Sequence, residues 1–314
     1  MMEIKKILKK DIPYLFENKS IWQSDFLPIS KHRLWAHYEN PNCADNDVVL
    51  LIAYLNDEMV GYMGVFMDKI TLDNIEEKIG WLSTWWMHPK TKGKGIGREL
   101  LTKMYNLNSG KIGISQFTES AKRVYDRSNY FTTLKKSKGI KAVLRSNLSE
   151  TIPLIFPSTK PYEDIFNFFD GVMNLFINVK LGISKIIIKN KLRKVTLEYL
   201  IKPDTESFAL ISNQNINNLS HKEISFFQWL KNFYWVQEAP LLSFTNKDRY
   251  AFSMYDKRFN IYYIKVCLKE TCIGFLVLQI RKNTCKVLFA YYPSNINLDT
   301  LCNIIKLQCI EQNI

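Results

Sequence analysis

The segment Trp81-Leu-Ser-Thr-Trp-Trp-Met-His-Pro-Lys-Thr-Lys-Gly-Lys-Gly-Ile-Gly-Arg-Glu-Leu-Leu101 decides the fold of the first half of the chain. An apolar run that favours a strand ends at Pro89, three glycines alternate between positions 93 and 97, and an amphipathic helical pattern follows at once. Glycines let successive backbone N–H groups point into one concavity, and a helix N-terminus adds partial positive charge. With the full charges of Lys92 and Lys94 beside it, the turn predicts a diphosphate-binding site.

Two better-known glycine turns fit this segment less well. A P-loop requires Gly-Lys-Ser/Thr, and the chain has Gly97-Arg98-Glu99 there. A dinucleotide turn follows the first strand of a parallel unit, with an acidic residue about 20 positions further on. Here the turn follows a predicted hairpin, Val48–Leu55 with Met59–Met67, and a third strand, Ile79–Met87. The order of elements therefore fits the dinucleotide fold poorly.

The pattern around the turn predicts an α/β (α+β) fold with a mixed, mostly antiparallel twisted sheet flanked by helices. Strands are expected at Glu3–Leu8, in the hairpin, at Ile79–Met87, at Ile112–Phe117 and as a pair within Tyr130–Leu144. Helices are expected at Asp11–Lys19, Ser30–Tyr38, Gly97–Asn106 and Glu119–Arg127.

A second, tandem domain is predicted after a boundary near residues 149–160, which are rich in Pro, Ser and Thr. The expected division is 1–148, a linker 149–194 that contains a basic amphipathic helix, and 195–314. The last segment repeats the strand, helix, hairpin and strand order of the first, and Ile273-Gly274-Phe275 parallels Val60-Gly61-Tyr62. Tyr292-Pro-Ser-Asn295 stands where the glycine turn would be, so the second domain is expected to be degenerate.

The linker helix has two readings. Its apolar stretch, Ile165–Ile188, contains Asp170, Asn174, Asn178 and Lys180, which argues against a membrane-spanning helix. A Phe/Met stripe followed by a basic run resembles an interfacial membrane helix, which would allow peripheral membrane contact through residues 165–194. The interpretation that we favour from the sequence is a helix that packs between the domains and leaves its lysines in water. The first residues show no secretory signal, so the cytoplasm is the expected location.

Composition limits the partners. Lys and Arg number 43 against 30 Asp and Glu, and the net charge of +13 suits phosphate-bearing ligands, an anionic membrane or nucleic acid. The cations are scattered among acids without a recognition motif, so no nucleic-acid partner is expected. Six cysteines lack metal-ligand spacing, and no metal is expected.

The strand, the His-Pro pair and the glycine turn before a helix together resemble the acetyl-CoA-binding motif of the GNAT N-acetyltransferase family, over roughly residues 1–145. Lys92 stands where the family usually has Arg or Gln. The hairpin with Val60-Gly61-Tyr62 and the segment Ala121–Phe131 fit the family's order, although Tyr130 replaces a glycine.

The resemblance implies that an acceptor amine or hydroxyl directly attacks the thioester of acetyl-CoA, while backbone N–H groups polarise its carbonyl. The cofactor-binding residues that it implies are Trp85, Trp86, Met87, Lys92, Gly93, Lys94, Gly95, Ile96, Gly97 and Arg98. Tyr125 matches the family's general acid for the leaving thiolate. Glu119, or a water held by Ser83 or Thr84, is the candidate base.

Three functions remain open from the sequence. The first is transfer of an acetyl group to a small-molecule amine, such as an amino sugar or nucleotide sugar. The second is transfer of an aminoacyl or longer acyl group, as in the related peptidoglycan-bridge enzymes. The third is binding of CoA without turnover. The second domain would shape the acceptor pocket or form a homodimer interface.

Overall fold

The computed structural model describes the whole chain except residues 23–25, 74, 135–138, 216–217, 234–251 and 253–257. The described residues form two compact units. Unit 1 comprises residues 1–135 and 201–259, and unit 2 comprises residues 136–200 and 260–314. This division differs from the three consecutive segments expected from the sequence, because a stretch from the second half of the chain packs with the first half.

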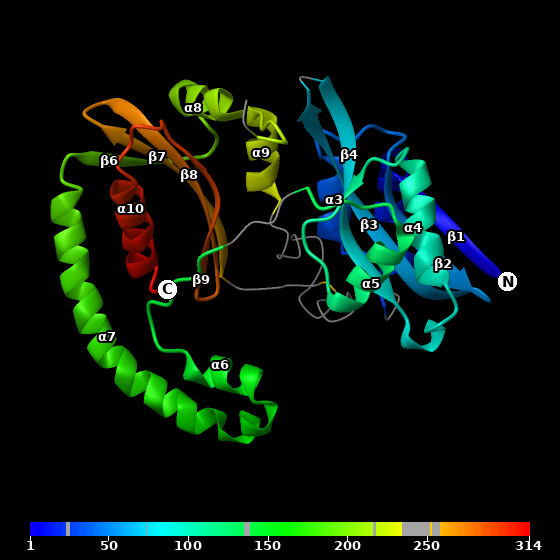
Figure 1. Cartoon of the computed structure of the whole chain (residues 1–314), viewed down its shortest axis with the longest axis horizontal. Helices are drawn as coiled ribbons and strands as arrows, with labels where there is room; N and C mark the ends of the chain where they lie inside the picture. The colour runs from blue at the N-terminus through cyan, green and yellow to red at the C-terminus, as the bar shows by residue number, and fades with distance from the viewer. Residues whose placement is uncertain (23–25, 74, 135–138, 216–217, 234–251, 253–257) are drawn as a thin grey trace. The chain divides into compact units, whose positions relative to one another are not determined.

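Unit 1 is built on a five-stranded sheet in the order β1-β2-β3-β4-β5 (Figure 1). Its strands are β1 (Met2–Leu8), β2 (Val48–Leu55), β3 (Glu58–Leu72), β4 (Ile75–Met87) and β5 (Ile112–Gly113). The first four strands pair antiparallel and β5 joins β4 in parallel, so the mixed, mostly antiparallel sheet expected from the sequence is confirmed. Consecutive residues of β2 and of the middle of β3 are buried, so the centre of the sheet is covered on both faces.

The described helices of unit 1 are α1 (Ile12–Glu17), α2 (Lys19–Trp22), α3 (Lys31–Tyr38), α4 (Ile96–Leu107), α5 (Glu119–Ser128), α8 (Thr205–Asn215) and α9 (Ile224–Asn232). Four of them, α1, α3, α4 and α5, lie where the sequence analysis expects helices. Ser30 caps α3 by accepting a hydrogen bond from the Arg33 N–H at 3.2 Å. The apolar side of α4 buries Ile96, Leu100 and Met104 in the core over the sheet.

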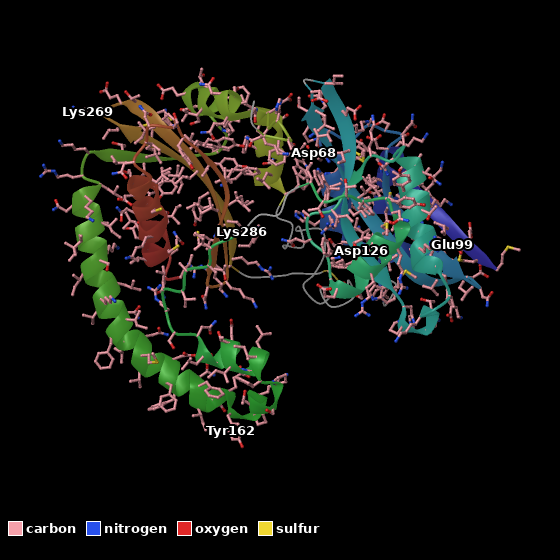
Figure 2. The ribbon with its side chains drawn as sticks, in the orientation of Figure 1. Asp68, Glu99, Asp126, Tyr162, Lys269 and Lys286 are labelled. Atoms are coloured by element: carbon pink, nitrogen blue, oxygen red, sulfur yellow. The ribbon has the colours of Figure 1, made fainter. Side chains whose placement is uncertain are left out.

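The stretch after residue 200 joins unit 1 through a polar cluster and an indole. Asp68 of β3 accepts hydrogen bonds from Trp81, Ser220 and Lys222 (Figure 2). The Trp229 indole N–H of α9 donates to the Ala36 carbonyl of α3 at 2.7 Å. Both contacts link positions about 150 to 190 residues apart, which no local sequence pattern reveals.

Unit 2 contains a four-stranded sheet in the order β6-β7-β8-β9 and three helices among its described residues. The strands are β6 (Val195–Leu200), β7 (Phe259–Leu268), β8 (Thr271–Arg281) and β9 (Thr284–Tyr291), and the helices are α6 (Leu148–Ile155), α7 (Glu163–Lys191) and α10 (Leu298–Glu311). The core lies between this sheet and α10 and includes Ile264, Leu276 and Ile304. α7 runs along α10 and continues to α6 (Figure 1).

Two expectations from the sequence are wrong in detail. The described residues between Tyr130 and Leu144 contain no strand, and residues 135–138 lie outside the described part. The strand expected over Ile112–Phe117 ends at Gly113. β-Branched and aromatic residues favoured strands there, but a strand also needs a partner, and the chain leaves the sheet after Gly113.

Candidate functional site

The site is centred on the edge of β4 where β5 departs. β4 pairs with β3 along its length, but with β5 only at Gly80↔Ile112 and Trp81↔Gly113. From Leu82 to Met87 the side of β4 that faces away from β3 has no described strand beside it. Backbone N–H and C=O groups on such an edge remain available for a ligand.

The direction of these N–H groups follows from the ladder. His88 N–H donates to the Val60 carbonyl of β3 at 2.8 Å. Because alternate residues of an antiparallel strand direct their N–H groups to opposite sides, Trp86 also faces β3. The N–H groups of Trp85 and Met87 therefore point to the open edge, where they can polarise a carbonyl group.

A β-bulge at Ser83 bends the strand at the beginning of this edge. Gly64 pairs with Thr84 and Val65 pairs with Leu82, which leaves Ser83 as the extra residue. A Cβ atom on Gly64 would lie 2.6 Å from Thr84 Oγ1 and 3.2 Å from Ser83 Oγ. The absence of a side chain at position 64 thus lets the two hydroxyl-bearing residues lie close to β3.

Gly64 is a site residue that the sequence interpretation missed. An isolated glycine inside an apolar strand indicates a bulge or a close backbone approach, so the signal was present. Its partner across the ladder was not evident, because pairing register depends on the whole hairpin. Ser83 and Thr84, predicted as residues that would hold a water, are brought together by this bulge.

The glycine turn connects the edge of β4 to α4. Gly93 and Gly95 have φ angles of 83° and 77°, a left-handed conformation that a residue with a side chain adopts only at a cost. The first bond of α4 runs from the Glu99 N–H to the Gly95 carbonyl at 3.1 Å. The N–H groups of the first helical turn, residues 96–98, precede this bond and lack acceptors within the helix. They form an anion-binding end of the helix.

The remaining residues of the turn surround this helix end. Ile96 is buried and anchors the helix, whereas Lys92, Lys94 and Arg98 are exposed. A Cβ on Gly97 would lie 3.1 Å from the Trp85 ring, so the glycine allows α4 to approach β4 closely. Three exposed cations and a helix N-terminus at one place make a strongly positive local field.

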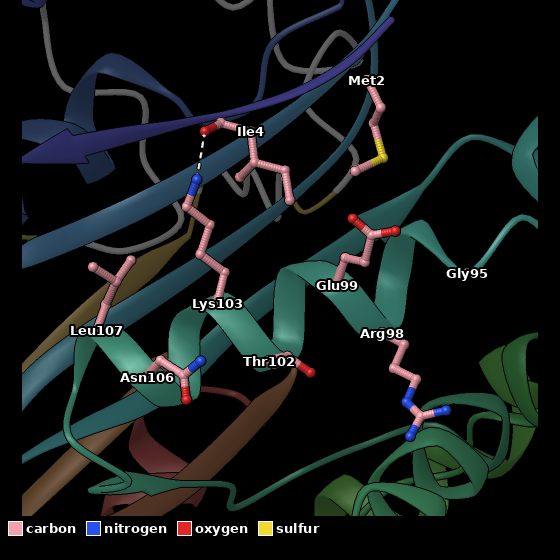
Figure 3. Close-up of a pocket in the computed structure, with 9 residues that line it drawn as sticks. All are labelled: Met2, Ile4, Gly95, Arg98, Glu99, Thr102, Lys103, Asn106 and Leu107. Atoms are coloured by element: carbon pink, nitrogen blue, oxygen red, sulfur yellow. Dashed lines mark hydrogen bonds between the residues drawn. The ribbon is translucent and has the colours of Figure 1, made fainter.

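An open depression of about 790 Å³ extends along α4 from this helix end. It is lined by Met2, Ile4, Gly95, Arg98, Glu99, Thr102, Lys103, Asn106 and Leu107. Figure 3 shows Lys103 reaching from α4 toward β1, where it donates to the Ile4 carbonyl at 2.9 Å, while Arg98 points away from that strand. The depression continues the positive surface of the turn along the outer side of the helix.

Tyr125 lies on α5 and packs against the open edge of β4. Its ring centroid is 5.3 Å from that of Trp85 and 5.2 Å from that of Phe131. Burial raises the pKa of Tyr125 to about 12, because the phenolate would lose its hydration. The phenol therefore stays protonated at neutral pH, which a proton donor requires.

Two other predicted residues, Trp86 and Glu119, lie away from Tyr125. Trp86 lies on the face of the sheet opposite α4, with its ring centroid 4.4 Å from that of Phe26. Glu119 is exposed in the first turn of α5. Six residues of helix separate it from Tyr125, which places the two side chains about 120° apart. The geometry brings Trp85, Ser83 and Tyr125 to one region and leaves Glu119 outside it.

Comparison with known proteins supplies the family of this region. Residues 15–124 match the model of the acetyltransferase (GNAT) family, and they contain β4, the glycine turn and α4. No curated protein sequence matches the chain.

Solved structures similar to the chain include an aminoglycoside acetyltransferase, a predicted acetyltransferase and a probable N-acyltransferase. One is an aminoglycoside acetyltransferase from an uncultured soil metagenomic sample, crystallised with trehalose or sisomicin, which has 14% identity and a TM-score of 0.31. It is matched over 46% of this chain and 97% of its own. A second, from Clostridium acetobutylicum with acetyl-CoA, has 21% identity over 48% of this chain and 98% of its own, with a TM-score of 0.32.

The third, a probable N-acyltransferase of Enterococcus faecalis, is matched over 98% of this chain and 63% of its own, with 9% identity and a TM-score of 0.48.

Proposed function

Because residues 15–124 match the model of the acetyltransferase (GNAT) family, we propose that unit 1 transfers an acetyl group from acetyl-CoA to the amine of a small molecule. An amino sugar or a nucleotide sugar is the acceptor class that we favour. The observation that carries the proposal is the continuity between the open edge of β4 and the N-terminus of α4. A thioester and a diphosphate within one ligand would contact both.

The diphosphate of CoA would lie at the turn. The N–H groups of residues 96–98 and the side chains of Lys92, Lys94 and Arg98 supply donors and positive charge there. The pantetheine arm would run along the free edge from Met87 toward Leu82, as an added strand does. This direction leads from the exposed turn to the bulge at Ser83.

The acetyl carbonyl would accept a hydrogen bond from the N–H of Trp85 or Met87. These donors are fixed by the β3–β4 ladder, so they need no reorganisation when the carbonyl oxygen becomes negative. The acceptor amine forms a bond to the carbonyl carbon, the carbon–sulfur bond breaks, and CoA leaves as a thiolate. Tyr125 would donate its phenolic proton to this thiolate.

A water molecule bound at the bulge would serve as the base. The Ser83 hydroxyl is buried, with no hydrogen-bond partner among the described residues. A water molecule bound by Ser83 would remove the proton from the attacking amine and pass it to solvent. Glu119 is the weaker candidate because it is exposed and lies outside this region.

Isothermal titration with acetyl-CoA tests the donor site. The wild-type chain should bind, and Gly95→Glu should lower affinity about 100-fold or more, since it adds a negative charge and a side chain at a φ of 77°. Gly182→Glu in α7 is the matched control and should bind as wild type, because nothing lies within 4 Å of its Cβ position. If the folded wild-type chain does not bind acetyl-CoA, the proposal is wrong.

A further inference from the structure

One side of α7 exposes a continuous row of large apolar side chains. Each member of the row is at least 41% exposed. The row consists of Ile165, Phe168, Phe169, Val172, Met173, Leu175, Phe176, Val179, Ile183, Ile186 and Ile187. Among the described residues, Pro157–Lys191 is the one helical stretch long and apolar enough to cross a membrane, and 11% of its most apolar window is buried. Exposed apolar patches of this extent mark interaction surfaces.

The row occupies one side of the helix. At about 100° per residue, its members fall within an arc of about 160° and extend roughly 33 Å along the axis. The opposite side is covered by the chain itself, because Asp170, Leu181 and Ile188 are buried. Ile188 belongs to the core of unit 2, and Lys185 and Lys189 pair with Glu311 of α10.

The polar residues within the apolar stretch lie on the covered side. Asp170, Asn174 and Asn178 are four residues apart, so they form one stripe. Asp170 accepts hydrogen bonds from the Ser146 hydroxyl and from the Leu148 and Ser149 N–H groups.

The other two members of the stripe bind the same segment. Asn174 exchanges two hydrogen bonds with the Ser146 backbone, at 2.8 and 3.0 Å. Asn178 accepts a hydrogen bond from Arg145 at 3.0 Å. These groups, which argued against a membrane-spanning helix from the sequence, are satisfied within the chain and lie away from the exposed row.

Positive charge accompanies the row. Residues 160–194 contain seven cations and three acids, Glu163, Asp164 and Asp170. The cations are Lys160, Lys180, Lys185, Lys189, Lys191, Arg193 and Lys194. Asp170 is engaged on the covered side, and Lys185 and Lys189 pair there with Glu311. The other five cations and two acids leave the charge that accompanies the apolar row positive. An apolar row flanked by cations is complementary to an anionic bilayer surface.

We propose that α7 binds an anionic lipid bilayer by lying in the plane of its interface, with the exposed row among the acyl chains and the cations at the headgroups. The helix lies on the bilayer and does not cross it. A crossing helix would place the polar stripe and the backbone of residues 145–149 in hydrocarbon, where groups from outside the helix cannot be hydrated.

Vesicle flotation of the full chain tests the proposal. Wild type should float with phosphatidylcholine vesicles that contain phosphatidylglycerol, and much less with phosphatidylcholine alone, because the cations contribute only on an anionic surface. Leu175→Gln with Phe176→Gln should reduce partitioning about tenfold or more. Both side chains are about 70% exposed, at 69% and 74%, so the fold does not depend on them.

A second double variant is the matched control. Ile75→Gln with Ile201→Gln changes two exposed apolar residues outside α7 and should float as wild type. Equal flotation of both double variants, or no flotation of wild type with anionic vesicles, would overturn the proposal. The proposal would also be overturned if the vesicle-bound protein resisted extraction at alkaline pH, because this would indicate a helix that crosses the bilayer.

Light scattering without lipid tests whether a second copy of the chain, and not a bilayer, covers the exposed row. A dimer of the wild type that becomes monomeric in the α7 variant, combined with no vesicle binding, would assign the row to a second copy of the chain and contradict lipid binding. The α7 variant should bind acetyl-CoA as wild type, so failure here and failure of the proposed function give different results.

Discussion

The two sheets contain the same bulged hairpin. A glycine lies opposite the bulge in unit 1, and a buried valine fills that position in unit 2. In unit 1, Tyr62 pairs with Trp86 and the bulge falls at Ser83. In unit 2, Phe275 pairs with Tyr291, and the shift between Val277 and Leu278 leaves Leu288 as the extra residue. Counted from these aromatic pairs, the two bulges occupy the same position. The degenerate second domain stays a prediction.

The residues at the bulge differ in size and polarity. Gly64 and Ser83 of unit 1 correspond to Val277 and Leu288 of unit 2. Val277 is fully buried, so an apolar core side chain in the second hairpin takes the position where the first hairpin has a glycine in close contact with the Ser83 and Thr84 hydroxyls. Both hairpins therefore have the bulge, but they differ in the side chains beside it. Only the hairpin of unit 1 has a glycine and a hydroxyl there, as the proposed donor site requires.

The helices that follow the two hairpins differ at their N-termini. α4 begins after Gly95, which has no side chain to bond the free N–H groups. α10 begins after Asn297, whose side chain accepts from the Asp299 N–H at 2.9 Å. The first helix end has no side-chain cap, which leaves its N–H groups free for an anion, while one N–H group of the second is bonded by the Asn297 side chain.

Exchanging the bulge residues should give the largest effect. Gly64→Val places a Cβ 2.6 Å from Thr84 Oγ1. The Thr84 side chain or β4 itself must move to make room, and either change alters the bulge. We expect acetyl-CoA affinity to fall about 100-fold or more, and stability to fall by about 1–3 kcal/mol. Titration calorimetry and urea unfolding measure the two effects.

The reverse exchange in unit 2 is the control. Val277→Gly removes a fully buried side chain and should cost about 2–4 kcal/mol without changing the affinity for acetyl-CoA. A Gly64→Val variant with unchanged affinity would show that the bulge does not shape the donor site.

Removing the hydroxyl group of Tyr125 should give the next largest effect, which we expect on kcat alone. Tyr125→Phe should lower kcat about 100-fold and leave the KM for acetyl-CoA unchanged, because the ring that packs on Trp85 is retained. Since burial raises the pKa of Tyr125 to about 12, the wild-type rate should not fall between pH 8 and 10 through loss of this proton.

Tyr130→Phe provides the comparison for that variant. Tyr130 stacks on Tyr105 at 4.0 Å, and its hydroxyl lies 3.3 Å from the Thr102 hydroxyl, on α4. It should retain wild-type kcat. If Tyr125→Phe binds acetyl-CoA and the wild type shows no turnover with any amine acceptor, unit 1 is a binding module and not an enzyme.

The sequence predicted the features of the site that depend on neighbouring residues. The glycine turn, the hairpin and the helix after Gly95 follow from local patterns, because each needs residues only a few positions apart. The bulge at Ser83 depends on pairing register, and the addition of residues 201–259 to unit 1 depends on contacts such as Trp229 with Ala36. Such long-range terms lie outside any local pattern. The stripe of Asp170, Asn174 and Asn178 was visible as a four-residue spacing, but its partners were not.

Acid should destabilise unit 1 before unit 2, because of His37. This side chain is buried in α3, stacked on Phe66 at 3.9 Å, and neither ring nitrogen has a hydrogen-bond partner among the described residues. Burial, with Arg33 nearby, holds the pKa of His37 well below its usual value. Below about pH 6.5 the unfolded chain binds a proton that the folded chain does not, so the stability of unit 1 falls as the pH falls.

The expected loss approaches about 1.4 kcal/mol for each pH unit below the unfolded pKa, until the folded pKa is reached. Hydrogen exchange at pH 7 and at mildly acidic pH should show protection lost in unit 1 before unit 2. His37→Leu should abolish this part of the pH dependence. An equal pH dependence in the variant would assign the effect to other groups.

The smallest expected effect concerns the cap of α10. Asn297→Ala removes the acceptor for the Asp299 N–H and should destabilise unit 2 by about 1 kcal/mol. Acetyl-CoA affinity should not change, since this helix end has no part in the donor site. Urea unfolding followed by hydrogen exchange in α10 measures the loss. The same substitution at Gly95 is not equivalent, because alanine at a φ of 77° adds strain where the wild type has none. If Asn297→Ala lowered acetyl-CoA affinity as well, the helix after the filled hairpin would retain a ligand role, and the contrast between the two sheets would fail at this point.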